Sequence, residues 1–487
     1  MPHRLRQVNI VHVSDVHFGR NHICAPDAPD WANVGLPDLG VMIQHDIEQR
    51  LAANPELGRP PTTPLIFAAT GDLTETASVE DETEFERAEA FLRRISRARR
   101  PDNDLRSLFV VPGNHDVVFN ETSSAERRWQ PYCRFYNRLF ADARAAVSEG
   151  NAHALTQLHD RTADGYVVAE VNSAFYVARG SADAERGQID NRALEQLGAQ
   201  LEELRRRTPE TFESAVRIAL MHHHPVLMPS LVEPGRGYDA IANGHRLLRL
   251  LQEFGFHLIL HGHKHYPQTF SYDPDYAWST KPRTPPPLLI VAGGSAGSSG
   301  LPDGTRRANS YNLITIKWHP DAGHARVQVR TRGLQRTDEE GAMAPDQWHW
   351  TDYAFKDRLV RPFDSLPATV GEATVLPPIG SADDRDRRAV YESTRGNMAV
   401  AEVFPSMCEG QAYEARVWIV PHSRNPENVP VEVTWNAGPK FERRRVTATD
   451  DPKFCATLSY WGSMLVEARL KFCDGQSASA FVYARIP

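Results

Sequence analysis

The sequence predicts a layered α/β domain followed by an all-β module, and two observations predict this organisation. Up to about residue 335, short apolar runs that suit buried strands alternate with amphipathic helical segments, as in α/β domains. After about residue 405, alternating strand patterns are separated by turn residues. We therefore expect an α/β domain at 1–335, a linker with partial structure at 336–405 and a β-sandwich at 406–487.

Five apolar runs predict buried strands, and polar side chains that suit metal binding follow each of them. The runs are 7–14, 63–70, 106–111, 214–221 and 256–260. They are followed by Asp15 and His17, by Asp72, by Asn114 to Asp116, by His222 to His224, and by His263 and His265. The carboxyl ends of strands collect along one edge of an open α/β sheet, so we expect these side chains to converge.

Helices and closing strands fill the rest of the first domain. Residues 78–100 carry a Ser78-x-x-Asp81 cap signal and apolar positions at helical spacing, and 192–206 are likewise amphipathic. Residues 286–300 read as a buried strand and a glycine-rich turn, which lacks the lysine of a phosphate-binding loop. The alternating segments 311–319 and 325–333 are expected to be closing edge strands.

The C-terminal strands are predicted by period-two alternation. Residues 413–421 and 431–435 read as strands, and 463–472 place apolar and charged side chains on opposite faces. Asp474-Gly475 then predicts a hairpin into 477–486. A small immunoglobulin-like sandwich is the simplest arrangement of these strands.

The composition favours a soluble globular protein. The 487 residues are 41% hydrophobic and 24% charged, with a formal net charge of -7, so we expect neither nucleic acid nor a membrane as a partner. Five cysteines without CxxC spacing indicate neither a disulfide framework nor a thiolate zinc site. With no transmembrane run and no apolar signal core, the sequence predicts a cytoplasmic location.

The residue types at the strand ends predict a two-metal centre. Such a centre needs oxygen and nitrogen ligands from several segments, one of which bridges both ions, and an open face for substrate. One such group arises easily by chance, but five in succession at strand ends favour a functional site. Carboxylates, imidazoles and an amide suit Mn, or a mixture of Fe and Zn, better than Mg.

These motifs resemble the signature of the calcineurin-like metallophosphoesterases. They are D-x-H at Asp15 and His17, G-D at 71–72, G-N-H-D at 113–116, H-H-x-P at 222–225 and G-H-x-H at 262–265. The resemblance spans roughly residues 7–330 and implies a four-layer fold, in which two mixed β-sheets face each other and helices cover their outer sides.

The resemblance also implies a role for each residue. Asp15, His17 and His265 would hold one ion, Asn114, His222 and His263 the other, and Asp72 would bridge them. His115 would be the general acid, oriented by Asp116, while His223 and Asn114 would contact the substrate. Two divalent ions lower the pKa of a shared water, so a bridging hydroxide would attack the phosphoester while His115 protonates the leaving oxygen.

Three consecutive histidines make one assignment ambiguous. If the strand continues through them, alternation directs His222 and His224 to one face and His223 to the other. The H-H-x-P pattern assigns the ligand to His222 and leaves His224 as a packing residue.

The substrate is expected to be a phosphomonoester or phosphodiester, and the motif form resembles the cyclic-nucleotide phosphodiesterase branch. Segments 18–40, 118–135 and 228–245 are expected to be loops that govern substrate choice. Two alternatives remain: a nuclease or protein phosphatase on the same scaffold, or a signalling protein in which the metal site is regulatory and the β-sandwich binds a partner.

The C-terminal module is similar to prokaryotic YEATS-like domains. The similarity rests on V-E-V-T-W at 431–435, on Phe441 and Phe454, and on the W-G step and F-x-D-G turn within 460–475. It implies an immunoglobulin-type sandwich that contacts a protein partner. A generic β-sandwich remains the alternative.

Overall fold

A computed structural model describes the greater part of the chain, which forms two compact units that divide at residue 369. The described residues are 6–24, 38–53, 63–98, 105–118, 124–141, 143–177, 186–227, 240–272, 287–299, 301, 308–318, 325–335, 348–360, 382–405, 413–422, 426–438, 445–448, 454–460 and 464–484. No helix within these ranges combines the length and the apolar character needed to cross a bilayer.

The first sheet of the first unit has the strand order β12, β11, β10, β1, β2, β3. These strands span His349–Val360, Ala325–Gln335, Ser310–Trp318, Arg6–Val13, Leu65–Ala69 and Leu108–Val110, respectively. Strands β1, β2 and β3 run parallel, whereas β10 pairs antiparallel with β1, β11 with β10, and β12 with β11.

The second sheet has the strand order β4, β5, β6, β7, β9, β8. Its strands span Gln157–Arg161, Tyr166–Glu170, Val216–Leu220, Leu258–His261, Leu288–Ala292 and Gln268–Tyr272, respectively. The four central strands are parallel, and β4 and β8 pair antiparallel at the two edges.

The two sheets pack face to face over a shared apolar core. Ile10 and Phe109 of the first sheet and Ile218 and Leu260 of the second belong to this core. Helices cover the outer face of each sheet, so the central strands are buried on both sides. This burial explains why the sequences of these strands are continuous apolar runs. The predicted four-layer fold is confirmed.

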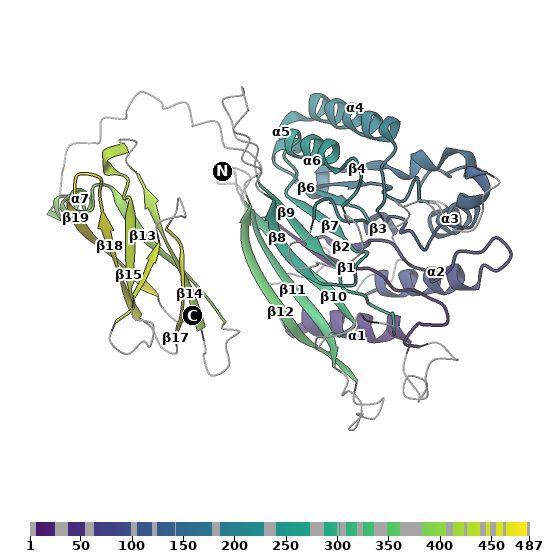
Figure 1. Ribbon diagram of the computed structural model, residues 1–487, viewed down its shortest axis with the longest axis horizontal. Coiled ribbons are helices and arrows are strands. Elements are labelled where there is room, and N and C mark those ends of the chain that lie inside the picture. Colours follow the sequence, from purple (N-terminus) through teal and green to yellow (C-terminus); the bar gives the residue numbers. More distant parts are fainter. Residues whose placement is uncertain are drawn as a thin grey trace. The chain divides into compact units, whose positions relative to one another are not determined.

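Helices α1, α2 and α3 pack on the first sheet, and α4, α5 and α6 on the second (Figure 1). They span Leu39–Ala53, Thr83–Ser96, Ala125–Phe140, Asn191–Arg207, Pro209–Glu213 and Gly244–Glu253, respectively. Short 3₁₀ turns occupy Leu105–Ser107, Glu149–Leu155, Thr162–Asp164 and Pro426–Asn428.

Two predictions about elements of the first unit are wrong. The helix expected from Ser78 begins at Thr83, because the Ser78 hydroxyl accepts the N–H groups of Glu80 and Asp81 in a turn of its own. Strands β10 and β11 are interior strands, since β12 covers the edge of β11. The alternating pattern shows that one face of each strand is more polar than the other. Interior strands and edge strands can both have this pattern, so it does not distinguish them.

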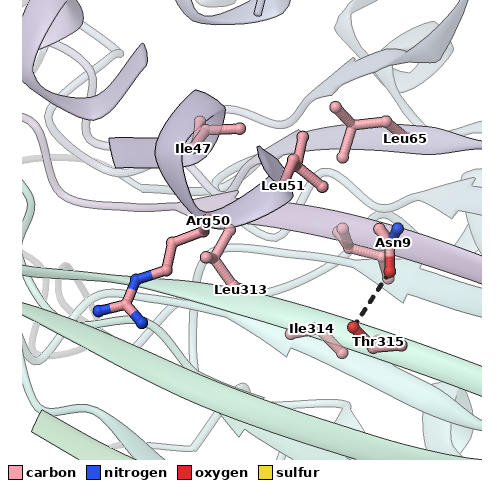
Figure 2. Close-up of a pocket in the computed structure, with 9 residues that line it drawn as sticks. Asn9, Ile47, Arg50, Leu51, Leu65, Leu313, Ile314 and Thr315 are labelled. Carbon is pink, nitrogen blue, oxygen red and sulfur yellow. Dashed lines mark hydrogen bonds between the residues drawn. The ribbon is translucent and has the colours of Figure 1, made fainter. Parts of the chain in front are cut away.

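A small cavity lies between α1 and the first sheet. It has a volume of about 20 Å³ and is lined mainly by apolar side chains, including Ile47, Leu51 and Leu313 (Figure 2). The Thr315 hydroxyl donates to Asn9 Oδ1 over 3.0 Å at its wall. At this volume it has room for about one water molecule.

The second unit contains helix α7 and two antiparallel sheets, in the orders β13-β14-β17 and β16-β15-β18-β19. Helix α7 spans Ala382–Ser393, and the strands span Asn397–Pro405, Tyr413–Pro421, Ala456–Tyr460, Arg445–Ala448, Glu432–Asn436, Met464–Lys471 and Ser477–Ala484, in the same order. The second unit has a separate apolar core, in which Trp435 is fully buried. The indole N–H of Trp435 donates to the Phe454 carbonyl over 2.7 Å.

The predicted hairpin joins β18 to β19, with Gly475 at a φ of 79°. Phe441 and the W-G step at 461–462 lie outside the described residues. The segment predicted as a partly structured linker, 336–405, contributes β12 to the first unit and α7 and β13 to the second.

Candidate metal centre

The polar side chains predicted to converge follow five parallel strands, three in one sheet and two in the other. Asp15 and His17 follow β1, Asp72 follows β2, Asn114 follows β3, His222 follows β6, and His263 and His265 follow β7. All seven side chains lie close together, because the carboxyl ends of these strands meet at one edge of the fold.

Asp15, His17 and His265 form one group of possible ligands. Each offers an atom within 4.8 Å of the others. His17 Nε2 lies 3.0 Å from His265 Nε2, which in turn lies 3.5 Å from Asp15 Oδ1. One carboxylate and two imidazoles thus face a common point.

The second group surrounds the amide oxygen of Asn114. Asn114 Oδ1 lies 3.1 Å from His222 Nε2 and 3.0 Å from His263 Nδ1. Asp72 lies between the two groups, because its Oδ2 is 3.7 Å from His17 Nε2 and 3.2 Å from His222 Nε2. A carboxylate in this position can bridge two cations.

The backbone at five of these seven residues adopts the left-handed region that non-glycine residues rarely occupy. Asp15, His17, Asp72, His263 and His265 have φ angles of 53°, 52°, 51°, 84° and 55°. Such conformations cost about 1–3 kcal/mol each and persist where the surrounding structure enforces them. Their concentration at one edge is typical of a functional site.

Two motif glycines are required by close approach. A Cβ at Gly113 would lie 2.1 Å from Asp72 Oδ1, and one at Gly262 would lie 1.8 Å from Ser14 Oγ and 2.5 Å from Asp15 Oδ2. Any larger residue would therefore displace a predicted ligand.

The glycine-rich segment after β9 supports the same edge. The Ser295 hydroxyl donates to the Asp15 carbonyl over 2.7 Å, and the Ala296 N–H donates to the Ser14 carbonyl over 3.0 Å. These contacts fix the backbone on either side of Asp15.

Burial and mutual charge shift the acids and bases of the site. Burial opposes the ionised form of Asp72, but His222 and His115 hold the pKa of its carboxyl well below the ordinary value. Burial likewise opposes the charged form of His222, yet Asp72 raises its pKa to about 9. A bound cation would supply the positive charge that His222 supplies here.

Three other imidazoles are held neutral. Burial lowers the pKa of His17, His223 and His263 well below the ordinary value. Burial also raises the pKa of Asp15. A neutral imidazole is the form that binds a metal ion, so burial prepares His17 and His263 for that task, whereas a cation would have to offset the effect of burial on Asp15.

The donor set fits divalent cations. It combines carboxylate oxygens, imidazole nitrogens and one amide oxygen, and the ring nitrogen that His263 directs toward Asn114 is Nδ1. Oxygen and nitrogen donors of these kinds bind divalent cations in proteins.

The contacts of His115 differ from the prediction. We expected Asp116 to orient its imidazole, but His115 Nδ1 lies 2.7 Å from the Glu75 carbonyl oxygen. The Asp116 carboxylate instead accepts the N–H groups of Gly113, Leu73 and Thr74. Its lone pairs are used by the backbone of the loops that carry His115 and Asp72.

His115 is exposed, unlike the predicted ligands around it. Burial opposes its charged form, but Asp72, the Glu75 carbonyl and Asp116 together raise the pKa of His115 above the ordinary value. An exposed imidazole that favours its protonated form suits a general acid.

The three consecutive histidines do not follow strand alternation, because β6 ends at Leu220. His222 and His223 have ring centroids 4.9 Å apart, and both offer nitrogens within 4.8 Å of one on His263. His224 packs against His261 with ring centroids 4.6 Å apart, and neither ring nitrogen of His224 has a hydrogen-bond partner in the described parts of the chain.

Sequence reasoning missed Glu75 and Ser173. Glu75 contributes its backbone carbonyl, for which no side-chain pattern exists, and Ser173 contributes one hydroxyl after a strand that was not predicted, β5. Of the segments predicted to govern substrate choice, 118–135 is not simply a loop, since α3 begins at Ala125. Within the other two, 25–37 and 228–239 lie outside the described residues.

Two family models match the chain. A family model of calcineurin-like phosphoesterases matches residues 8–267, and a model of the prokaryotic YEATS domain matches 413–485. No curated protein matches the chain.

Three solved structures illustrate the similarity. Phosphopantetheinyl hydrolase (PptH) from Mycobacterium tuberculosis is 12% identical with a TM-score of 0.30, over 59% of this chain and 90% of that one. Vps29 from Chaetomium thermophilum is 11% identical with a TM-score of 0.28, over 73% and 97%. A Yaf9 YEATS domain recognising an H3K122suc peptide is 12% identical with a TM-score of 0.15, over 18% and 68%.

Proposed function

Because the chain belongs to the calcineurin-like phosphoesterases, a family of metal-dependent hydrolases, we propose that it hydrolyses a phosphomonoester or phosphodiester with two divalent cations. The observation that carries this proposal is Asp72, whose Oδ2 lies within 3.7 Å of His17 Nε2 and 3.2 Å of His222 Nε2, between two groups of possible ligands.

Each group would hold one cation. Asp15, His17 and His265 would bind the first, Asn114, His222 and His263 the second, and Asp72 both. When bound, the cations would supply positive charge that stabilises phosphoryl oxygens and makes a water molecule more acidic. Mn, or Fe with Zn, suits these ligands.

His115 would protonate the leaving alkoxide. Its Nδ1–H donates to the Glu75 carbonyl, which leaves Nε2 as the atom that gives up a proton to the substrate oxygen. Asp116 would support this role indirectly, because its carboxylate holds the N–H groups of Gly113, Leu73 and Thr74. Asn114 and His223 would contact the phosphoryl group.

The substrate proposed first is a phosphodiester, with a cyclic nucleotide as the leading candidate. The H-H-x-P and G-H-x-H forms of the motifs support this choice. The alternatives are a nuclease or a protein phosphatase, and the formal net charge of -7 favours a small substrate over DNA.

Metal analysis and a panel of phosphoesters on wild type and Asp72→Ala test the proposal. We expect about two ions per chain in the wild type, and loss of activity and of at least one ion in the variant, because the bridging carboxylate is gone. Asp81→Ala, which removes an exposed carboxylate from the turn before α2, is the matched control.

The panel should include nitrophenyl monoesters and diesters, cyclic nucleotides, a phosphopeptide and single-stranded DNA. Two ions retained in Asp72→Ala would contradict the bridging role. No cleavage of any ester by the metal-loaded wild type would favour the alternative of a signalling protein with a regulatory metal site.

We also propose that the second unit binds a protein partner, which the match to the prokaryotic YEATS domain supports. Leu465, Phe481 and Tyr483 are more than half exposed on β18 and β19 and are apolar contacts for such a partner. Phe481→Ser should abolish capture of that partner by the full chain while phosphoester hydrolysis continues; unchanged capture would exclude this face.

A further inference from the structure

The hydroxyl of Ser173 lies among three nitrogens of the adjacent residues His222 and His223. Its Oγ is 3.2 Å from the His222 backbone nitrogen, 3.1 Å from the His223 backbone nitrogen and 2.9 Å from His223 Nδ1. Ser173 is completely buried just beyond the end of β5. None of the motifs in the sequence includes this residue.

Counting hydrogens and lone pairs assigns the direction of each contact. A hydroxyl oxygen has two lone pairs and one hydrogen. The backbone N–H groups of His222 and His223 can only donate, so they use both lone pairs of Ser173 Oγ. The remaining contact must therefore run from the Ser173 hydroxyl to His223 Nδ1, and Nδ1 carries no hydrogen. The hydrogen of the neutral imidazole is then on Nε2.

His222 is constrained in the opposite sense. Its Nδ1 lies 2.7 Å from the Thr70 carbonyl oxygen, which can only accept. A cation that replaced the positive charge of His222 would leave its hydrogen on Nδ1 and a lone pair at Nε2, toward Asp72 and Asn114. The two neighbouring histidines thus have opposite tautomers, set by a carbonyl in one case and by a hydroxyl in the other.

We propose that Ser173 is a positioning residue that makes His223 a hydrogen-bond donor to a phosphoryl oxygen instead of a cation ligand. A nitrogen that bears hydrogen has no lone pair for a cation, but it can donate to an anionic oxygen. This inference rests on the proposed function. It specifies that His223 contacts the phosphoryl group and not the cations.

The surroundings of His223 support this role. Its Nε2 is buried and has no hydrogen-bond partner among the described residues, although a nitrogen of this ring lies within 4.8 Å of nitrogens of His222 and His263. The opposite side of the ring is closed by Gly187, where a Cβ would come within 2.5 Å of His223 Cγ. The imidazole is therefore held in one orientation, and its Nε2–H remains available to donate to a substrate oxygen.

Neutron diffraction from deuterated crystals of the full chain, loaded with Mn²⁺, tests the tautomers without any substitution. We expect deuterium on Nε2 of His223 and on Nδ1 of His222. Deuterium on Nδ1 of His223, or a Mn²⁺ ion bonded to His223, would overturn the inference. This readout does not depend on turnover, so it remains decisive even if no phosphoester proves to be a substrate.

Binding of inorganic phosphate to the Mn²⁺-loaded chain tests the consequence. Losing a hydrogen bond to a charged group weakens binding by about tenfold or more, so His223→Ala should raise the dissociation constant for phosphate by that factor. His223→Gln, whose amide N–H can donate from a similar position, should retain most of the affinity. Equal losses in the two variants would contradict the donor role.

Ser173→Ala should weaken phosphate binding several-fold while the Mn²⁺ content stays the same. The controls are Ser96→Ala in α2 and His257→Gln, which precedes β7 at the end of that strand opposite to His263; they remove a buried hydroxyl and a buried imidazole, and neither should change phosphate affinity. Unchanged phosphate affinity in Ser173→Ala, or loss of Mn²⁺ from it, would show that Ser173 does not act through the donor of His223.

Discussion

His115 combines exposure with a fixed orientation, which distinguishes it from the buried residues beside it. Its Nδ1 contacts the Glu75 carbonyl over 2.7 Å, and its backbone N–H donates to Asp72 Oδ1 over 2.8 Å. The backbone of His115 thus contacts the Asp72 carboxylate, while Nε2 of its side chain remains available for a substrate.

His115→Ala should lower turnover by about two to four decades, because the leaving alkoxide would depart without a proton donor. The metal content should not change, since the backbone contact to Asp72 does not need the imidazole. Steady-state kinetics and metal analysis on the same preparation check both expectations. His45→Ala, which removes an exposed imidazole from α1, is the control, and unchanged turnover in His115→Ala would remove the acid role.

The sequence predicted the convergence of seven residues because each stands directly after an apolar run, and strand ends meet. It could not predict what orients His115, because the acceptor is a backbone carbonyl that any residue at position 75 would provide. The preference for Asp116 followed proximity along the chain, whereas the structure uses that carboxylate to hold three N–H groups.

At the level of elements, Glu170 at the end of β5 joins the two sheets. Its carboxylate accepts the N–H of Val110 in β3 over 2.7 Å, lies 2.7 Å from His159 Nε2 of β4 and pairs with Arg144 at 3.0 Å. Burial alone would raise the pKa of Glu170, but Arg144 and His159 lower it to about 2.

This shift predicts a contribution to acid stability. The folded-state pKa lies below the ordinary value of 4.5, so the stabilisation is complete above 4.5 and is lost as the pH falls toward about 2. It amounts to about 3 kcal/mol of unfolding free energy. Urea unfolding between pH 6 and pH 3 should show about 2 kcal/mol of this loss in the wild type.

In Glu170→Gln most of this dependence should disappear, and the protein should already be less stable at pH 6, because Arg144 is left buried without its counterion. Glu202→Gln, an exposed change on α4, should behave as the wild type does. Parallel pH profiles for Glu170→Gln and the wild type would contradict the assignment.

Leu51 of α1 is buried beside the small cavity and anchors the helix to the first sheet (Figure 2). Leu51→Ala should destabilise the first unit by about 2–5 kcal/mol, since it removes apolar contacts and enlarges an existing void. Urea unfolding followed by tryptophan fluorescence measures this. Leu227→Ala, at an exposed leucine, should change stability by less than about 0.5 kcal/mol, and similar values for both would refute the packing argument.

Helix α3 shows why some elements escaped prediction. Pro131 lies inside it, and proline argues against a helix interior. The helix forms nonetheless because Trp129, Tyr132 and Phe135 bury aromatic rings in the core of the first unit, and this tertiary contact outweighs the local cost. Strand β12 escaped for a related reason, since its charged and aromatic alternation resembles the surrounding loop-like sequence.

At the level of the whole molecule, each unit has its own apolar core, and the two cores share no residues. Calorimetry of the full chain should therefore resolve two unfolding transitions. Mn²⁺ should raise the temperature of the first unit's transition by a few degrees, because a ligand at 100 times its dissociation constant stabilises by about 2.7 kcal/mol. The second transition should not move.

Asp72→Ala is the control, and its first transition should respond to Mn²⁺ less than that of the wild type. A single transition, or equal shifts in both, would contradict independent units. The layered architecture was predictable from strand and helix alternation, whereas the division at residue 369 depends on the pairing of β12 with β11, a long-range contact with no local signal.

The left-handed backbone at five residues of the candidate metal centre places thermal stability and activity in opposition. At several of these positions asparagine or glycine would adopt the left-handed conformation at a lower energetic cost. Such substitutions should therefore make the protein more stable. Laboratory selection for heat tolerance alone, with no demand on turnover, should therefore accumulate substitutions at Asp15, His17 and Asp72. The most heat-stable variants from such a selection should therefore be inactive.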